Sequence, residues 1–255
     1  MTSPAAVKSG TFRTCPATGL KIDLRGEALV KANAVAAVVF LLVGSIAALL
    51  IVLTRWQAVH LLPATWFYRL LGVHAMNMLI FFIIYFEMAV LWFAGTALLN
   101  ARAAAPRYGW FNFGLMITGS LIVEWMQWSG KADVLFTSYP PLKADPRFYL
   151  GIILFAVGAL SVTAQFFGTL VIAKREKTYA GSMPLVVYGA MTAAIISVIT
   201  LLHGAIIYIP TFLWSLGLIP TVDPEIYRMI WWGLGHSSQQ INVAAMVAIW
   251  YMLGA

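Results

Sequence analysis

Cysteine and charged side chains are scarce in this sequence. Its 255 residues contain one cysteine, Cys15, and only 10% are Asp, Glu, Lys or Arg. A single cysteine excludes an internal disulfide and a cysteine-rich metal site. Soluble domains carry about a quarter charged residues, so the low charge content excludes a soluble enzyme. The chain also lacks a glycine-rich phosphate loop, which excludes the common nucleotide-binding functions.

Long apolar runs fill most of the chain instead. Hydrophobic residues make up 62% of the sequence, and the mean hydropathy is +0.87. A helix needs about 20 apolar residues to cross the hydrocarbon layer of a membrane. We therefore predict an all-α membrane protein, with a cytoplasmic N-terminal tail over residues 1–28 and a six-helix transmembrane domain over residues 29–255. The predicted spans are 29–53, 66–99, 108–128, 148–173, 184–208 and 224 to the end.

Basic residues are divided unevenly between the two sides of such a bundle. Ten of the 16 Lys and Arg fall in the tail through Lys31 and in the loops after the second and fourth spans, against six on the other side. Loops rich in Lys and Arg stay on the cytoplasmic side. The sequence therefore predicts a multi-pass protein of the cell's inner membrane with a cytoplasmic N-terminus. The net charge of +7 reflects this topology, and no nucleic-acid partner is expected.

Two histidines fall inside the apolar runs. His74 lies near the start of the second predicted span, and His236 lies in the middle of the sixth, within the segment 235–240. An imidazole in hydrocarbon is costly and commonly marks a functional site. Two of them on separate spans indicate a metal or a heme inside a helix bundle, and a hydrogen bond to a neighbouring helix is the alternative for either. We predict structural or interfacial roles for His60 and His203.

Three segments of the sequence carry a family resemblance: LGVHAMNMLIF (71–81), FTSYPPL (136–142) and WWGLGH (231–236). The first resembles the second helix of the catalytic subunit I of the heme-copper oxidase superfamily, where a histidine ligates the low-spin heme. The second resembles that subunit's loop between helices three and four. The third resembles the start of its helix-six motif, where the histidine binds copper. The segments occur in the family's order, and the resemblance covers most of the chain from about residue 30 onward.

The resemblance implies cofactors and ligands. His74 would be an axial ligand of a low-spin heme, and His236 would bind the copper that faces a high-spin heme. Arg69, five residues before His74, would suit a heme propionate, because a guanidinium pairs well with carboxylates, and an arginine at the level of the lipid headgroups is the alternative. The family's subunit is a bundle of about twelve helices. This chain therefore corresponds to its first half, and the ligands of the second half have no counterpart here.

The resemblance also implies partners. The remaining helices of subunit I, from a longer chain or from a second polypeptide, would complete both metal sites, so this chain alone is expected to be an incomplete enzyme. A second subunit that carries a cytochrome c or copper would accompany it in the respiratory chain. A c-type cytochrome or a quinol would donate electrons, and NO or O2 would be the substrate.

Gln240 bears on the choice of substrate. It lies four residues after His236, one helical turn further on, and so on the same helix face. Many oxygen-reducing members of the family have a tyrosine there, whose phenol supplies a proton and an electron for O–O cleavage. Reduction of two NO to N2O needs no phenol, so Gln240 favours an NO reductase in which it positions a proton donor or water at the copper. The alternative is a cytochrome c or quinol oxidase that reduces O2 to water and translocates protons, because some members carry the tyrosine on helix seven.

Other polar groups lie inside the predicted spans. Glu87 follows His74 by 13 residues, about 20 Å along a helix, where a carboxylate would suit a proton path. A paired carboxylate at the membrane boundary is the alternative. Glu124 is interpreted as an interfacial acid in an aromatic belt. Hydroxyl and amide groups that would line a polar path, or bond across helices, are those of Ser161, Thr163, Gln165, Thr192, Ser197 and Thr200.

A non-catalytic membrane scaffold and a proton-coupled transporter are remoter alternatives. A transporter could use the two histidines for proton coupling, but no pair of Gly- or Pro-broken spans occupies matching positions in the sequence. A scaffold would need no histidine in the middle of a span. A heme absorption band would exclude both.

Overall fold

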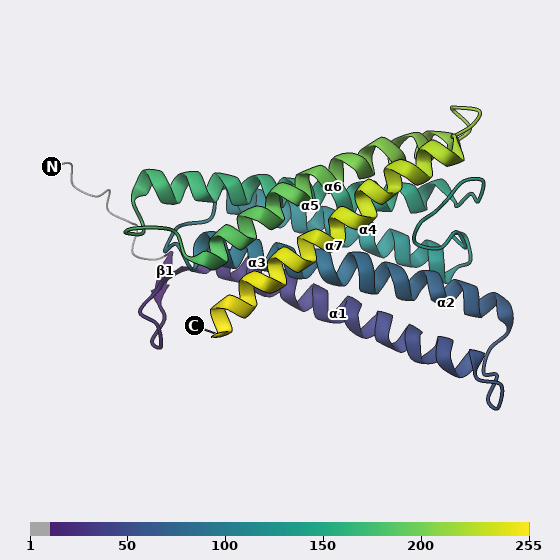
Figure 1. Cartoon of the computed structure of the whole chain (residues 1–255), viewed down its shortest axis with the longest axis horizontal. Helices are drawn as coiled ribbons and strands as arrows, with labels where there is room; N and C mark the ends of the chain where they lie inside the picture. The colour runs from purple at the N-terminus through teal and green to yellow at the C-terminus, as the bar shows by residue number, and fades with distance from the viewer. Residues whose placement is uncertain (1–10, 255) are drawn as a thin grey trace.

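Helices dominate the computed structural model, which describes residues 11–254. Within that range six long helices run along a common axis and turn back at each end (Figure 1). The helical fold predicted from the sequence is confirmed. The helices are α1 (Leu24–Arg55), a continuous rod made of α2 (Ala64–Met76), η1 (Asn77–Phe81) and α3 (Phe82–Thr96), α4 (Pro106–Trp128), α5 (Pro146–Glu176), α6 (Leu185–Ser215) and α7 (Pro224–Gly254).

Four of these helices are long and apolar enough to cross a membrane: α1, the α2–α3 rod, α5 and α6. The other two reach the length but carry more polar groups. Helix α4 contains Asn112, Glu124 and Gln127, and α7 contains the polar segment 235–240. Apolarity alone therefore supports four spans among the described residues, fewer than the six predicted.

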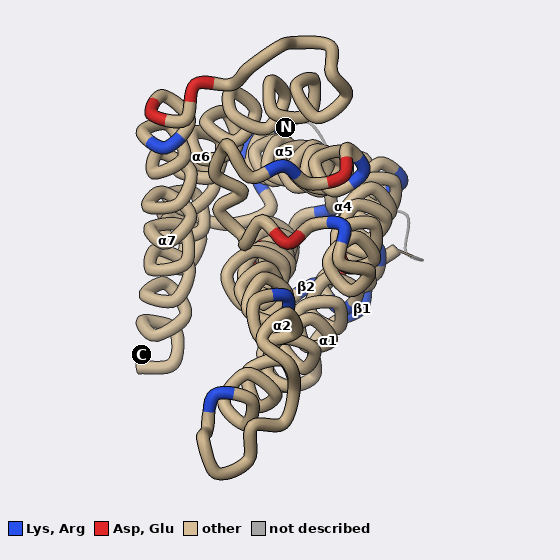
Figure 2. The backbone as a smooth tube through the Cα atoms, turned by 90° about the vertical axis from the view of Figure 1, so that its right-hand side faces the viewer, with Lys and Arg blue, Asp and Glu red and all other residues tan. Residues whose placement is uncertain are grey.

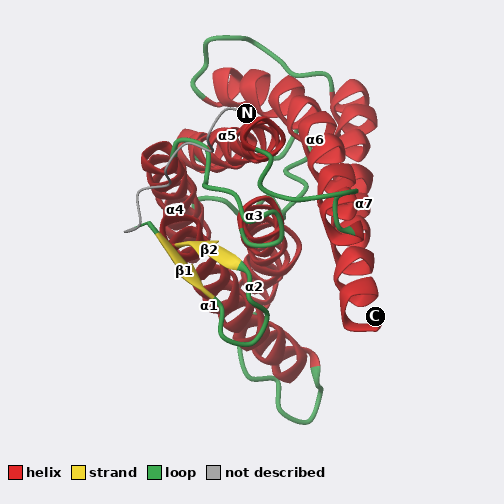
Figure 3. Ribbon diagram, turned by 90° about the vertical axis from the view of Figure 1, so that its left-hand side faces the viewer, coloured by secondary structure: helices red, strands yellow, loops and turns green. Residues whose placement is uncertain are grey.

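A two-stranded antiparallel hairpin precedes α1 (Figure 3). It pairs β1 (Phe12–Thr14) with β2 (Lys21–Asp23). Asp23 ends the hairpin and caps the helix, since its carboxylate accepts a hydrogen bond from the backbone N–H of Gly26 at 3.3 Å. Helix α1 therefore begins at Leu24 rather than at residue 29. Residues 1–10 of the predicted tail lie outside the described residues.

The hairpin lies at the same end of the bundle as the loop after α3 and the end of α5. The backbone N–H of Lys21 donates to Oδ1 of Asn100 at 2.7 Å, and Arg102 pairs with Glu176 at 2.9 Å. Figure 2 views the opposite end, where other charged residues lie in loops and at helix ends. The two groups of basic residues behind the predicted orientation therefore belong to opposite ends of the bundle.

Glycine allows α4 and α5 to pack closely. A Cβ atom on Gly119 would lie 2.4 Å from the carbonyl oxygen of Gly151 and 2.7 Å from the backbone nitrogen of Phe155. A Cβ atom on Gly158 would lie 2.7 Å from the carbonyl oxygen of Asn112. Helices in a membrane associate through such close backbone contact, because lipid is as apolar as their side chains.

Aromatic rings fill the centre between α1, α3 and α5. The rings of Phe40 and Tyr85 stack with centroids 5.4 Å apart, and the ring of Phe155 meets Tyr85 edge-on at 5.5 Å. The Tyr85 hydroxyl lies 3.1 Å from the hydroxyl of Ser120 on α4, which satisfies it in the interior. This cluster joins four helices and fixes the rod that carries His74.

Candidate functional site

His74 is held by a backbone group of α1. Its Nδ1 atom lies 2.9 Å from the carbonyl oxygen of Gly44, and its ring is half-buried. A carbonyl oxygen can only accept, so Nδ1 is the donor in this bond, and Nε2 has no hydrogen-bond partner among the described residues. Histidines that bind metals are commonly oriented in this way, with the second ring nitrogen donating to a backbone carbonyl. The geometry therefore fits His74 as a metal or heme ligand through Nε2.

Gly44 makes this contact possible. A Cβ atom at Gly44 would lie 2.8 Å from the side chain of Met78 and 3.0 Å from Cβ of Asn77. A larger residue would push α1 away from the rod and lengthen the bond to His74. Sequence reasoning missed Gly44, although a lone glycine in the apolar run 29–53 is a signal of close helix approach.

A π-helical turn, η1, follows His74 directly. The Asn77 side chain donates to the carbonyl oxygen of Val73 at 2.8 Å and to Oε1 of Glu124 on α4 at 2.5 Å. Oε2 of Glu124 accepts from the indole N–H of Trp128 at 2.7 Å. Glu124, interpreted from the sequence as an interfacial acid, thus also bonds inward to the rod. π-Helical turns occur frequently at functional sites. Here Asn77 provides a hydrogen bond to the carbonyl oxygen of Val73, which directly precedes His74, and links the rod to Glu124 of α4.

Arg69 lies in the first half of α2 and forms an ion pair. Its guanidinium bonds the carboxylate of Asp133 at 3.2 and 3.3 Å and lies over the ring of Trp66, 4.9 Å from its centroid. The predicted contact with a heme propionate would share this guanidinium with Asp133.

His236 and Gln240 lie exposed on α7. The ring of His236 contacts that of Trp232, with centroids 5.0 Å apart. Across residues 11–254, no group of three or more His, Cys, Asp and Glu is placed to hold a metal ion. The structure thus offers His236 as a single imidazole, and the described chain does not close a copper site around it.

Two of the sequence segments behind the family resemblance meet in space. The ring of Trp231 lies 5.5 Å from that of Phe136 and 5.8 Å from that of Tyr139. The hydroxyl of Tyr227 donates to the carbonyl oxygen of Thr137 at 3.1 Å. The loop 136–142 therefore packs on the start of α7, just before His236.

The remaining two histidines lie away from His74 and His236 in the sequence, and their predicted structural or interfacial roles stay predictions. His60 is exposed in the loop before α2. Nδ1 of His203 lies 2.8 Å from the carbonyl oxygen of Ile199 on its own helix, and its ring packs against Gly233 of α7.

The polar side chains of α5 and α6 do not form one continuous path. Ser161, Thr192 and Thr200 each donate to a carbonyl four residues earlier on their own helix. Thr163 and Ser197 lie 3.4 Å apart across α5 and α6, which is the cross-helix bond that the sequence allowed.

An apolar cavity of about 130 Å³ opens between the rod, α5, α6 and α7. Leu234 and Ser238, on either side of His236 in the sequence, both contribute to its wall. Its remaining lining is almost wholly aliphatic or aromatic, drawn from residues such as Met76, Phe155 and Leu201.

Comparison with known proteins places the chain in a family. Residues 28–254 match the family described as Cytochrome C and Quinol oxidase polypeptide I. The chain belongs to this family. The curated cytochrome c oxidase subunit 1 of Thermus thermophilus is 31% identical over 176 residues, which cover 67% of this chain and 30% of that protein.

A solved structure of a heme-copper terminal oxidase dimer shares the fold of this oxidase-family chain. The two superpose with a TM-score of 0.81 at 24% sequence identity, over 89% of this chain and 39% of the other. The chain thus spans less than half the length of either relative. The resemblance drawn from the three sequence segments is confirmed. The relatives are described as oxidases, so the preference for NO reduction drawn from Gln240 is not confirmed.

Proposed function

We propose that this chain forms part of a respiratory membrane oxidase that reduces O2 with electrons from a c-type cytochrome or a quinol. The observation that carries the proposal is the bond between His74 and the Gly44 carbonyl, which leaves Nε2 free to ligate iron. A heme bound there supplies reversible one-electron transfer. The chain's contribution is to fix the plane of the imidazole and to hold Nδ1 against the Gly44 carbonyl oxygen.

His236 is proposed as one ligand of the copper. A copper site needs several imidazoles, and the described residues offer one at this place. The other ligands, and the high-spin heme, would come with the remaining helices of a subunit I bundle, in this polypeptide or in another.

The proposal also includes the placement of the six helices and the N-terminus in the membrane. All six helices would cross the cell's inner membrane, α4 and α7 shielding their polar groups inside the full bundle, with the N-terminus in the cytoplasm. A subunit that carries cytochrome c or copper would deliver electrons at the opposite surface.

NO reduction is the second candidate, and Gln240 favours it. An amide can orient a proton donor but cannot easily be oxidised, and NO reduction does not require an oxidisable group. Gln240 lies exposed on the same side of α7 as His236, where it would face the completed metal site.

Gas consumption by the native complex distinguishes the two candidates. The complex would be purified from membranes through this chain, and its heme spectrum recorded before O2 and NO consumption are measured with the same reduced donor. We expect a heme Soret band and O2 consumption well above NO consumption. Faster consumption of NO would favour the second candidate, and a complex without heme would overturn both.

Replacement of Gln240 by alanine should slow turnover of the complex about tenfold or more, since placing a proton donor commonly contributes 10²–10⁴-fold. The low-spin heme spectrum should stay unchanged, because His74 lies on a different helix. Steady-state gas consumption measures the effect. Gln239→Ala is the matched control, an exposed amide at the neighbouring position on α7.

Gly44→Ala should weaken the low-spin heme site. The added methyl group would meet Met78 and Asn77 at 2.8–3.0 Å and displace α1 from His74. Loss of such an orienting bond typically costs about 10–100-fold in affinity for the metal group. Heme content per chain and the low-spin absorption band measure the change. Ser45→Ala, at the next and exposed position, should leave both unchanged.

A further inference from the structure

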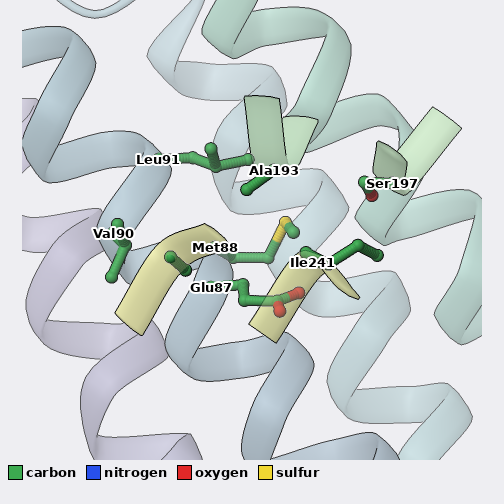
Figure 4. Close-up of a pocket in the computed structure, with 8 residues that line it drawn as sticks. Glu87, Met88, Val90, Leu91, Ala193, Ser197 and Ile241 are labelled. Carbon is green, nitrogen blue, oxygen red and sulfur yellow. The ribbon is translucent and has the colours of Figure 1, made fainter. Parts of the chain in front are cut away.

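A cavity with room for a single water lies between α3, α6 and α7 (Figure 4). Its volume is about 10 Å³, close to the least space that holds one water molecule. Among the described residues, Glu87 and Ser197 are the polar ones that line it. The apolar lining consists of Met88, Val90, Leu91, Ala193, Ile241 and Ala245.

Glu87 is buried without a partner. Only 3% of the residue is exposed, and neither carboxyl oxygen has a hydrogen-bond partner among the described residues. In Figure 4 its carboxyl group points toward α7 near Ile241. In the part of the chain that the structure describes, no other titratable or charged side chain lines the cavity from α3, α6 or α7. A carboxylate ionised here would have no partner to offset the cost of removing its charge from water.

In its protonated form, the Glu87 carboxyl group is a proton donor inside the cavity. A water in the cavity could accept it and also bond the hydroxyl of Ser197, which gives that water the two or three polar partners that buried waters need. Ser197 in turn lies 3.4 Å from the hydroxyl of Thr163 on α5. Acids inside a membrane protein are expensive and commonly mark proton relays.

The position of Glu87 along the rod gives the relay a direction. It lies nine residues before the end of α3 at Thr96, or about 14 Å, and 13 residues after His74, or about 20 Å. The Thr96 end is the one with the hairpin and the basic loops. On the other side the cavity wall includes Ile241, the residue that follows Gln240.

We propose that Glu87 is a proton-relay residue that connects the Thr96 end of the bundle with the level of Gln240. One carboxyl oxygen gives its proton to the cavity water, that water releases one proton toward the level of Gln240, and the carboxylate then takes up a proton that arrives from the Thr96 side, so that the site ends with the charge and protons it began with. The proposal rests on the proposed function, because reduction of O2 or NO consumes protons.

Infrared spectroscopy tests the relay without turnover. Difference spectra between the wild-type complex and its Glu87→Gln variant would isolate the band of the protonated carboxyl group, in H2O and after transfer to D2O. Because a relay residue exchanges protons with water, we expect the band to shift to the deuterated position within the mixing time. A carboxyl band that stays unexchanged would overturn the proposal, whether or not the complex turns over.

Turnover provides the second readout. Glu87→Gln should lower gas consumption and coupled proton uptake at least about tenfold while the heme spectrum and heme reduction by the donor stay normal. Glu87→Asp, which keeps the acid, should recover part of the rate. Glu225→Gln, the same change at an exposed acid of α7, should have no effect. Full proton uptake in Glu87→Gln would overturn the relay, whereas a wild-type complex without heme would count against the proposed function alone.

Discussion

Replacement of His74 by alanine should remove the low-spin heme from the assembled complex. The imidazole is the one ring whose Nδ1 is fixed by a neighbouring helix, at 2.9 Å from the Gly44 carbonyl oxygen, so its loss removes a preorganised ligand. We expect the low-spin band of the reduced spectrum to disappear and donor oxidation to fall at least about 100-fold, since even orienting groups are worth about 10–100-fold. Heme extraction and reduced-minus-oxidised spectra, normalised to this chain, measure the effect.

A histidine outside the site supplies the control. His60 is exposed in the loop before α2, with φ at 45°. Asparagine tolerates that backbone conformation, so His60→Asn should keep both the heme and the rate. Retention of the full low-spin heme content in His74→Ala would contradict the assignment of this ligand, and the alternative of a purely structural hydrogen bond to α1 would then stand.

The helices could be predicted from the sequence because their signal is local. A run of about 20 apolar residues decides a span whatever surrounds it, and each predicted span overlaps one observed helix. The ends were less predictable, since single contacts decide them. The cap by Asp23 starts α1 at Leu24. Helix α6 continues through Pro210 to Ser215, beyond the predicted end at 208, because neighbouring helices in a membrane bundle can compensate for the lost hydrogen bond.

The candidate site was predictable only in its residue types. The sequence singled out His74, but the free ring nitrogen depends on Gly44, which lies 30 residues away. The bond between Asn77 and Glu124 joins residues 47 apart, and the isolation of Glu87 depends on what α6 and α7 leave unfilled. Tertiary contacts of this kind leave no periodic pattern in one sequence. A hydrogen bond to another helix was the alternative to metal binding for His74. The structure has that bond at Nδ1, while Nε2 has no hydrogen-bond partner among the described residues, so the bond does not exclude a metal at Nε2.

Replacement of Gly119 by leucine should separate α4 from α5 and destabilise the bundle severely. The first atom of the new side chain would lie 2.4 Å from the carbonyl oxygen of Gly151 and 2.7 Å from the backbone nitrogen of Phe155. Both obstacles are backbone, which no side-chain rotation can relieve. Overpacking of a core costs about 1–3 kcal/mol when side chains can adjust, so we expect a loss above about 3 kcal/mol here. Thermal unfolding of the detergent-purified complex measures it.

Gly114 provides a matched control for Gly119, because it lies on the same helix and faces outward. A Cβ atom added at Gly114 would meet no atom of the described residues within 4 Å. Gly114→Leu adds the same side chain and the same gain in helix propensity, about 1 kcal/mol, without meeting another helix. It should therefore unfold at or above the wild-type temperature, whereas Gly119→Leu unfolds well below it. Equal unfolding temperatures for the two variants would show that α4 and α5 are held together elsewhere, since only one of the two positions lies at their contact.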